Sequence, residues 1–203
     1  FGLGELTTSG FPGESAGMLT HYSNWRPISQ ATLAYGYGIS VTPLQLAQAY
    51  AAIGNGGQLR PVSLVALDAP ADSARVLSEE TATSVRRMLE EVVRPGGTGT
   101  KAAIDGYRIA GKTGTAWKFA TGGYSQDKYI SIFAGLAPAS DPQLATVVVI
   151  DEPGGELYYG SDVAAPVFAD VMSESLRLLA VPPDALPARD PSNAMQAMAT
   201  RPE

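Results

Sequence analysis

Three strand-like runs follow one another between residues 107 and 151, and short connections join them. The runs cover residues 107–118, 129–137 and 144–151, and Gly-rich or Asp-Pro segments separate them. Because parallel strands need a long crossover and antiparallel strands do not, this spacing predicts antiparallel pairing. Residues 145–150 (ATVVVI) are apolar on both faces, which predicts a central strand covered by helices on both sides.

Two amphipathic segments before these runs predict helices whose first residues can be recognised. Thr42 can cap a helix over residues 43–54, which begins with a proline and ends at a glycine. Ser78, followed by two glutamates, can cap a second helix that ends near Pro95. Between the two helices, the apolar run at residues 62–67 predicts a short strand.

A third amphipathic segment precedes a Pro-rich end of the chain. Apolar residues form one stripe over residues 163–179, where Pro166 suits the first turn of a helix. After residue 181 come four prolines between positions 182 and 191 and little periodicity, which predicts a surface tail. The sequence therefore predicts an α/β chain of the α+β type, an antiparallel sheet flanked by helices, over residues 1–181, with a Pro-rich tail at 182–203.

Charge and composition exclude several classes of function. The formal net charge is −6, with 14 Lys and Arg against 20 Asp and Glu, and no basic run offers a surface for nucleic acid. The absence of cysteine and the single histidine argue against thiolate or multi-histidine metal sites, so neither a metal nor a cofactor is predicted. No stretch approaches the ~18 apolar residues that cross a bilayer. The chain begins at Phe1 without methionine, as a piece of a longer protein would.

The first strand-like run carries the segment Gly111-Lys112-Thr113-Gly114-Thr115, which places a cation and two hydroxyls within five positions. Strand alternation puts Thr113 and Thr115 on one face and Lys112 on the other. Two hydroxyls can grip a carboxylate, and the long lysine stem can bring its ammonium to the same cleft. Gly114 lets a substrate lie against the backbone, and an open strand edge would let an extended peptide pair with it. The competing interpretation is a surface strand beside a turn.

Six blocks of sequence resemble, in order and spacing, the C-terminal half of class B penicillin-binding proteins, the division-type peptidoglycan transpeptidases. The blocks are AYGYGISVTPLQLAQAYAAIGNGG (34–57), GTGTKAA (97–103), AGKTGTA (110–116), FAGLAP (133–138), IDEP (150–153) and AAPVF (164–168). The resemblance covers nearly everything from Phe1 to about Pro187. It implies the fold shared by penicillin-binding transpeptidases and serine β-lactamases, incomplete in this chain.

What the resemblance implies is an acyl-transfer enzyme. In that family a serine attacks the D-Ala-D-Ala end of a peptidoglycan stem peptide, and an amine of a neighbouring stem resolves the acyl-enzyme. Lys112 would support proton transfer and attract the substrate carboxylate, which Thr113 and Thr115 would bind beside Gly114. The backbone N–H of Thr115 would supply half of the oxyanion hole.

The resemblance also implies an aromatic wall and a set of partners. Tyr124, Tyr158 and Tyr159 resemble aromatic positions that line the antibiotic pocket in related enzymes, although each could equally be a partly buried core or loop tyrosine. The implied partners are stem peptides ending in D-Ala-D-Ala, the β-lactam antibiotics that imitate them, and membrane proteins of the division complex. The implied location is the periplasmic face of the bacterial inner membrane, with an anchor that is not in this chain.

Two further elements of the family, Ser-x-x-Lys with the nucleophile and Ser-x-Asn, have only accidental counterparts here. Ser125 and Lys128 satisfy the first spacing but follow the Lys-Thr-Gly strand, in a Gly-rich loop between strands. Tyr22-Ser23-Asn24 satisfies a variant of the second, in a region where family members carry a variable loop. We therefore expect both true elements in a part of the same protein upstream of Phe1.

Two alternatives stay open at this point. One is a serine β-lactamase or D,D-carboxypeptidase of the same fold, and the other is a non-catalytic penicillin-binding module. The block at 35–57 favours a transpeptidase because it resembles the class B enzymes. A pair of glycosidase-type carboxylates is a weaker candidate. Asp151 and Glu152 are adjacent at a strand end, so their side chains should diverge and could not flank one bond. Glu90 is expected at a helix end or on a solvated face.

Overall fold

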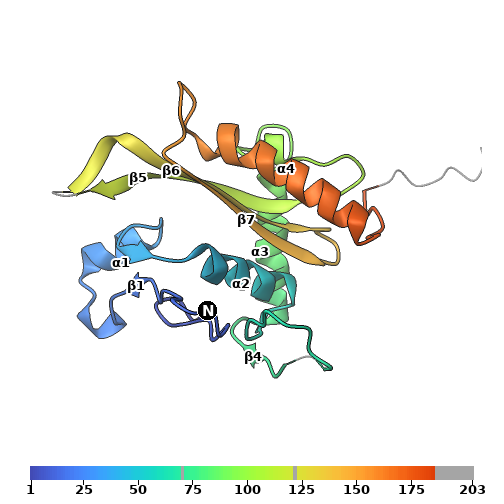
Figure 1. Ribbon diagram of the computed structural model, residues 1–203, viewed down its shortest axis with the longest axis horizontal. Coiled ribbons are helices and arrows are strands. Elements are labelled where there is room, and N and C mark those ends of the chain that lie inside the picture. Colours follow the sequence, from blue (N-terminus) through green and yellow to red (C-terminus); the bar gives the residue numbers. More distant parts are fainter. Residues whose placement is uncertain (70, 121–122, 186–203) are drawn as a thin grey trace, which may run out of the picture.

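A three-stranded antiparallel sheet lies between helices in the computed structural model, which describes residues 1–69, 71–120 and 123–185. Its strands are β5 (Ala110–Ala120), β6 (Gly123–Ala137) and β7 (Leu144–Asp151), in the order β5-β6-β7. Figure 1 shows α4 (Gly160–Leu178) across one face of this sheet and α2 (Pro43–Gly54) below the other. The predicted antiparallel sheet flanked by helices is confirmed.

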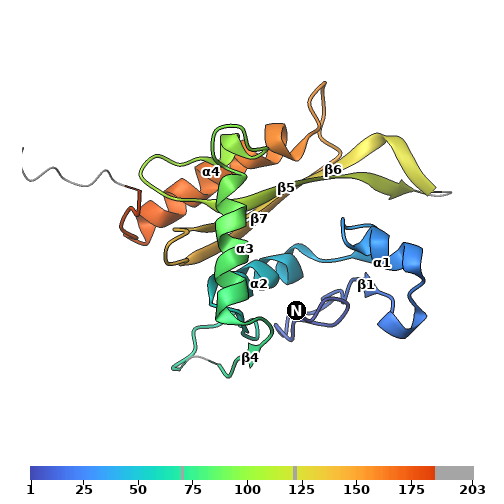
Figure 2. The same ribbon diagram turned by 180° about the vertical axis from the view of Figure 1, so that it is seen from behind.

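The first two predicted helices are present with the predicted caps. The side chain of Thr42 accepts a hydrogen bond from the backbone N–H of Gln45, whose own side chain returns the bond to the N–H of Thr42. Ser78 caps α3 (Glu79–Glu91) by accepting from the N–H of Thr81. Figure 2, seen from behind, shows α3 beside α2 and passing over the sheet, where α3 contacts β5.

The remaining elements are short. Two-residue strands pair as β1 (Met18–Leu19) with β2 (Ile39–Ser40) and as β3 (Gln58–Leu59) with β4 (Ala74–Arg75). A seven-residue helix, α1 (Pro27–Leu33), and two 3₁₀ turns, η1 (Tyr22–Asn24) and η2 (Thr100–Ala102), complete the set within the described residues. None of these was predicted from the sequence, because such elements depend on tertiary packing more than on local periodicity.

The sheet separates two groups of buried side chains. On the α4 face, Phe133 of β6 packs against Phe168, Met172 and Leu176 of α4. On the other face, a smaller group is formed by Ala110, Leu136 and Ala139, with Tyr50 and Ile53 of α2 and Leu89 of α3 packed against it. Successive residues of β5 and β6 therefore face different cores, and the strand that carries Lys112 is fixed from both sides.

Three expectations about these elements are wrong. Residues 62–67 form no strand, because the Ser63 hydroxyl bonds both the C=O and the N–H of Val65 and the run stays largely exposed. The helix predicted over residues 163–179 is α4, which begins at Gly160, so Pro166 lies inside it and not in its first turn. The strand predicted to be central, β7, lies at an edge of the described sheet. Its two faces are covered by α2 and α4 as predicted, and this helix cover accounts for its apolar character.

Glu90 was expected at a helix end or on a solvated face, and the structure places it at a helix end but buried. It lies in the last turn of α3, but its side chain is 7% exposed and accepts two hydrogen bonds from the guanidinium of Arg108, at 3.0 Å to Nε and 2.9 Å to Nη2. Arg108 lies just before β5, so the pair joins the end of α3 to the start of the sheet. The burial of Glu90 follows from tertiary packing, which the helical pattern alone does not reveal.

The C-terminal part of the described chain stays attached to the sheet. Asp184 accepts hydrogen bonds from the backbone N–H of Arg108 and from both the N–H and the hydroxyl of Ser140. Most of the predicted tail, residues 186–203, lies outside the described residues. The boundary at 181 stays a prediction. Within residues 1–69, 71–120 and 123–185, none of the helices combines the length and the apolar character that a membrane span needs.

Candidate active site

The Lys-Thr-Gly motif lies in the first half of β5, at one edge of the sheet formed by the described strands. Gly111 is the second residue of the strand, and a Cβ at this position would come within 2.7 Å of the Phe133 ring. The first glycine of the motif is thus required by packing against the core below it. The motif itself follows immediately along the strand, held against β6.

The side chains of the motif leave opposite faces of β5, as alternation predicts. Thr113 and Thr115 pair with Phe133 and Ser131 of β6, on the face that α4 covers, whereas Lys112 pairs with Ala134 on the other. The Lys112 ammonium then turns back to its neighbour: Nζ donates to the carbonyl oxygen of Thr113 at 2.9 Å and lies 3.2 Å from its hydroxyl oxygen. A cation and a hydroxyl therefore meet at the strand edge.

A third hydroxyl joins this group from outside the motif. Thr98, in the turn before η2, has its hydroxyl oxygen 3.3 Å from that of Thr113. The Gly-rich block at 97–103 was quoted for its resemblance, but no role was predicted for Thr98. The Gly-rich sequence around Thr98 indicates a turn, but it does not indicate which part of the fold that turn contacts.

Tyr158 and Tyr159 lie beside Thr115, around an open hollow of about 260 Å³. The other residues that line it are Tyr37, Trp117 and Tyr129. The Tyr158 ring stacks on Tyr129 with centroids 4.0 Å apart and an interplanar angle of 15°. Five aromatic side chains thus surround one hydroxyl of the motif, a surface suited to an apolar group next to a polar anchor.

Tyr124 is placed differently from the other two predicted tyrosines. It does not line the hollow; its ring contacts Tyr37 edge-on, with centroids 5.7 Å apart, and lies 5.6 Å from Phe119. Tyr37 is therefore shared between the hollow and this neighbouring aromatic row. Sequence reasoning gave no role to Tyr37, Trp117 or Tyr129, although Tyr37 stands in the long block at 34–57.

The hydroxyl of Tyr158 is held in its protonated form by its neighbours in the hollow. Tyr158 donates a hydrogen bond to the hydroxyl of Tyr159 at 3.2 Å. This bond, together with desolvation, raises the pKa of Tyr158 to about 12. The hydroxyl therefore keeps its proton and acts as a donor, not as a base, near pH 7.

Four charges cluster at the end of β7, next to the loop that carries the tyrosines. Lys118 of β5 donates to Asp151 Oδ2 and to Glu152 Oε1, each at 2.8 Å, and Lys128 of β6 donates to the other oxygen of Glu152 at 3.0 Å. The expectation that Asp151 and Glu152 diverge is wrong, because Glu152 has a positive φ of 51° and no longer follows strand alternation. The bonds from Lys118 and Lys128 lower the pKa of Glu152, while Asp151 and then Glu152 raise the pKa of Lys118.

The side chains of the two accidental motifs are engaged in hydrogen bonds and ion pairs with nearby residues. Ser125 lies within β6 and not in a loop, and its hydroxyl donates to Asp127 at 2.6 Å, while the ammonium of Lys128 is paired with Glu152. Ser23 lies in η1 and bonds to the ring of the exposed His21 at 2.7 Å. The Lys128 ammonium is therefore held at Glu152 and not at the Ser125 hydroxyl, where the lysine of a Ser-x-x-Lys element would lie.

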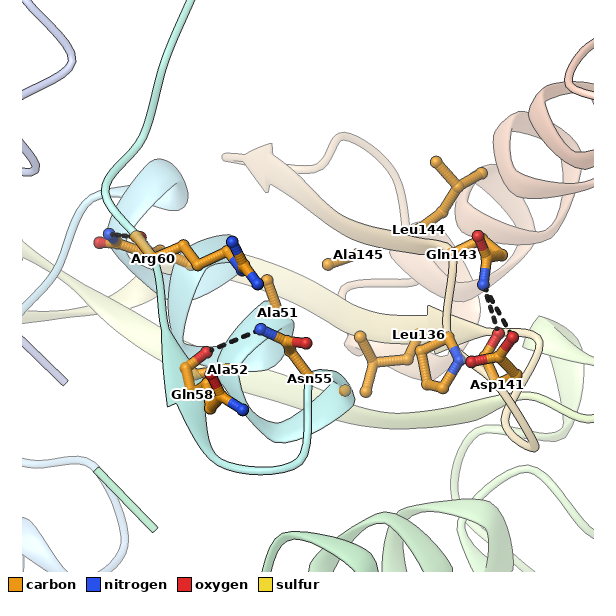
Figure 3. Close-up of a pocket in the computed structure, with 13 residues that line it drawn as sticks. Ala51, Ala52, Asn55, Gln58, Arg60, Leu136, Asp141, Gln143, Leu144 and Ala145 are labelled. Atoms are coloured by element: carbon orange, nitrogen blue, oxygen red, sulfur yellow. Dashed lines mark hydrogen bonds between the residues drawn. The ribbon is translucent and has the colours of Figure 1, made fainter. Parts of the chain in front are cut away.

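A larger hollow of about 290 Å³ lies elsewhere, between the end of α2 and the turn from β6 to β7 (Figure 3). Its polar side chains bond to neighbouring backbone: Asn55 to the carbonyl of Gln58 and Gln143 to that of Asp141. None of the motif residues lines it. Within the described ranges no three His, Asp or Glu side chains gather as metal ligands would.

Comparison with known proteins places these features in a family. The domain family described as "Penicillin binding protein transpeptidase domain" matches residues 1–173. The chain is 48% identical over 190 residues to the "Peptidoglycan D,D-transpeptidase FtsI" of Escherichia coli K12, which covers 94% of this chain and 32% of that protein. It is 46% identical over 182 residues to the "Probable peptidoglycan D,D-transpeptidase PenA" of Neisseria meningitidis, covering 90% of this chain and 31% of that protein.

A solved structure agrees with the sequence relatives. The apo transpeptidase domain of penicillin-binding protein 3 from Burkholderia pseudomallei superimposes with a TM-score of 0.85 at 46% identity, over 92% of this chain and 56% of that chain. The chain spans about a third of the length of the curated relatives it matches. Sequence, fold and the edge position of the Lys-Thr-Gly strand lead to one conclusion: this chain belongs to the penicillin-binding protein transpeptidase family.

Proposed function

We propose that this chain supplies the substrate-binding strand of a peptidoglycan D,D-transpeptidase. The observation that carries the proposal is the meeting of the Lys112 ammonium with the Thr113 hydroxyl on the outer strand of the sheet. A cation and hydroxyls at a strand edge can bind the terminal carboxylate of an extended peptide, while the strand backbone pairs with the peptide itself. The relatives named as D,D-transpeptidases support this reading.

The proposed reaction has two acyl-transfer steps. A serine hydroxyl attacks the carbonyl of the penultimate D-Ala, its proton passes to the departing D-Ala amine, and an acyl-enzyme forms. The amine of a neighbouring stem then attacks that ester, which restores the serine and joins the two peptides. We place the serine, in its Ser-x-x-Lys element, and the Ser-x-Asn element upstream of Phe1, in a part of the same protein.

Within these steps, each motif residue has a defined task. Lys112 supports proton transfer and attracts the substrate carboxylate, and Thr113 and Thr115 bind that carboxylate beside Gly114. The Thr115 N–H provides half of the oxyanion hole, a contribution of roughly a hundred- to a thousandfold in rate for one such donor. Tyr158 and Tyr159 wall the hollow beside Thr115, and Tyr124 extends the aromatic surface through Tyr37.

The same proposal includes the setting of the enzyme. Its ligands are stem peptides ending in D-Ala-D-Ala, and β-lactams imitate them because their strained amide takes the place of the scissile bond. Its location is the periplasmic face of the inner membrane, where septal cell wall is made, with division-complex membrane proteins as partners. The names of the FtsI relatives support a cell-wall role.

The test uses the intact protein and a fluorescent penicillin. We expect covalent labelling of the wild type, and a loss of roughly a hundredfold or more in labelling rate for Lys112→Ala, because the ligand carboxylate then lacks its cation. Ser125→Ala and Lys128→Ala are matched controls from the accidental motif and should label like the wild type. Unchanged labelling of Lys112→Ala would contradict its role.

A second measurement separates the transpeptidase from a hydrolase of the same fold. With a donor stem peptide and an acceptor amine, a transpeptidase yields the cross-linked peptide, a carboxypeptidase yields only hydrolysed donor, and a β-lactamase leaves the donor peptide unchanged. Hydrolysis without any cross-linked product would overturn the transpeptidase assignment and leave the acylation chemistry intact.

A further inference from the structure

The first residue of α4 makes a direct contact with the candidate active site. The backbone N–H of Gly160 donates to the hydroxyl oxygen of Thr115, with an N···O distance of 3.0 Å. The first N–H groups of a helix have no partner within the helix, and the N-cap residue Tyr159 provides no side-chain acceptor here. The Thr115 hydroxyl thus caps a 19-residue helix while also lining the hollow.

This contact decides which way the Thr115 hydroxyl can act. A threonine hydroxyl has one proton to donate and two lone pairs that accept. Because Gly160 fills one lone pair from behind, the proton must point in another direction, and Thr115 is exposed on the side of the hollow. The N–H bond also polarises the O–H bond, so a donation from Thr115 to an anion is strengthened.

The close approach of the helix to the strand depends on the absence of a side chain at position 160. A Cβ there would lie 2.4 Å from the carbonyl oxygen of Ile132 and 2.5 Å from that of Gly114. Both oxygens belong to the backbone of the sheet, so neither can move aside cheaply. Any larger residue would push the first turn of α4 away from Thr115.

A buried serine holds the same segment from the neighbouring strand. Ser131 is directly opposite Thr115 in the register of β5 and β6, is fully buried, and donates its hydroxyl proton to the carbonyl of Tyr158. Figure 1 shows the connection from β7 leading to the first turn of α4 over this part of the sheet. Tyr158 and Gly160 are therefore fixed by two facing residues, one from each strand.

We propose that Gly160 is a positioning residue whose N–H makes the Thr115 hydroxyl a donor directed at the ligand carboxylate. Ser131 supports this role by fixing the backbone on which Gly160 sits. The inference rests on the proposed function, since the carboxylate is that of the stem peptide or of a β-lactam. It adds a specific requirement, because the motif threonine then depends on a helix 45 residues later in the chain.

The test compares two probes, benzylpenicillin and its methyl ester, which differ in the carboxylate that Thr115 would bind. Acylation rates of the intact protein give a ratio of acid to ester for each variant. Glycolic acid at position 160, introduced by cell-free translation, replaces the amide by an ester and removes the N–H without adding an atom. We expect this replacement to lower the acid-to-ester ratio roughly tenfold, because the Thr115 hydroxyl then loses the bond that directs its proton to the carboxylate.

Matched variants separate this role from a structural one. The same replacement at Gly154, an exposed loop glycine with open space around it, should leave the ratio unchanged. Gly160→Ala should lower the ratio as well, and combining it with Thr115→Val should lower it no further than Thr115→Val alone. A purely structural role would slow both probes equally, and an unchanged ratio in the glycolic acid variant would overturn the inference.

These outcomes also distinguish the inference from the proposed function. A wild type that neither probe acylates would overturn both. A wild type that is acylated, and that loses acid preference in Thr115→Val but keeps it in the glycolic acid variant, would overturn only the role of Gly160. If Gly160→Ala does not fold, the glycolic acid variant decides the question, because it adds nothing to the crowded space behind the strand.

Discussion

Lys112 and Thr113 leave opposite faces of β5, yet their polar ends meet at the strand edge. This could be predicted from the sequence, because a lysine stem is long enough to turn around the edge of a strand. Thr98, Tyr37 and Gly160 could not be predicted in the same way. Each of the three lies near the motif only through tertiary packing, and the local sequence around each does not indicate which part of the fold it contacts.

Tyr50 of α2 gives a prediction at the level of a single titrating group. It packs against the buried group of Ala110, Leu136 and Ala139, and burial raises its pKa to about 12. The unfolded chain ionises near the ordinary value of 10, so the stability that Tyr50 contributes is complete below pH 10 and is lost as the pH rises toward 12.

We therefore expect the free energy of unfolding of the complete transpeptidase domain to fall between pH 10 and 12. Tyr50→Phe should remove about 2 kcal/mol of that fall, a value discounted for the part of the side chain that water reaches. Urea unfolding at pH 9 and pH 11.5 measures the difference. Tyr22→Phe, at an exposed tyrosine, is the control, and an identical fall in wild type and Tyr50→Phe would refute the assignment.

At the scale of elements, the starts of two helices were predicted correctly because they depend on local hydrogen bonds. Thr42 and Ser78 cap their helices because a hydroxyl one position before an amphipathic segment finds the free N–H groups of its first turn. The run at 62–67 misled for a related reason: strand propensity needs a partner strand, and the local bonds of Ser63 supplied an alternative. The start of α4 at Gly160 depends on its contact with β5, which no periodicity reveals.

The pair of Glu90 and Arg108 joins the end of α3 to the start of the sheet, and its removal should be costly. Arg108→Met leaves the Glu90 carboxylate buried without its partner, which we expect to destabilise the complete domain by about 2–3 kcal/mol. This lies at or below the low end of the 3–5 kcal/mol typical of broken buried pairs, because Arg108 is 43% exposed. Chemical denaturation measures the change.

Two further variants give this prediction its controls. Arg94 pairs with Glu91 on the exposed surface of the same helix end, so Arg94→Ala should cost no more than about 0.5 kcal/mol. Glu90→Leu combined with Arg108→Met should recover most of the lost stability, since the buried charge is then gone. A cost for Arg108→Met as small as that for Arg94→Ala would show that the pair does not hold the two elements together.

At the scale of the whole molecule, the candidate site is assembled from separate stretches of chain that meet at the sheet. β5 supplies the motif, the segment at 158–160 supplies two tyrosines of the hollow and the N–H that bonds the Thr115 hydroxyl, and the segment at 34–38 supplies Tyr37. The fold class could be predicted because three strand-like runs with short connections lie between amphipathic helical segments. The assembly of the site could not, since it depends on which strand ends meet in space.

The hydrogen bonds of residues 181–185 predict where the folded domain ends in the sequence, and a pair of truncations tests this boundary. The Tyr107 hydroxyl donates to the carbonyl of Val181, and the N–H of Ala185 donates to the carbonyl of Gly106, with Asp184 bonded between them to Arg108 and Ser140. We expect the protein truncated after residue 185 to match the full chain in stability. Truncation after residue 181 should cost about 1–2 kcal/mol, the net value of the exposed hydrogen bonds that Asp184 and Ala185 make. Thermal unfolding of both forms, with Asp184→Ala in the full chain as the matched point variant, measures this cost; equal stability of the two truncations would instead place the boundary at residue 181, where the proline pattern predicts it.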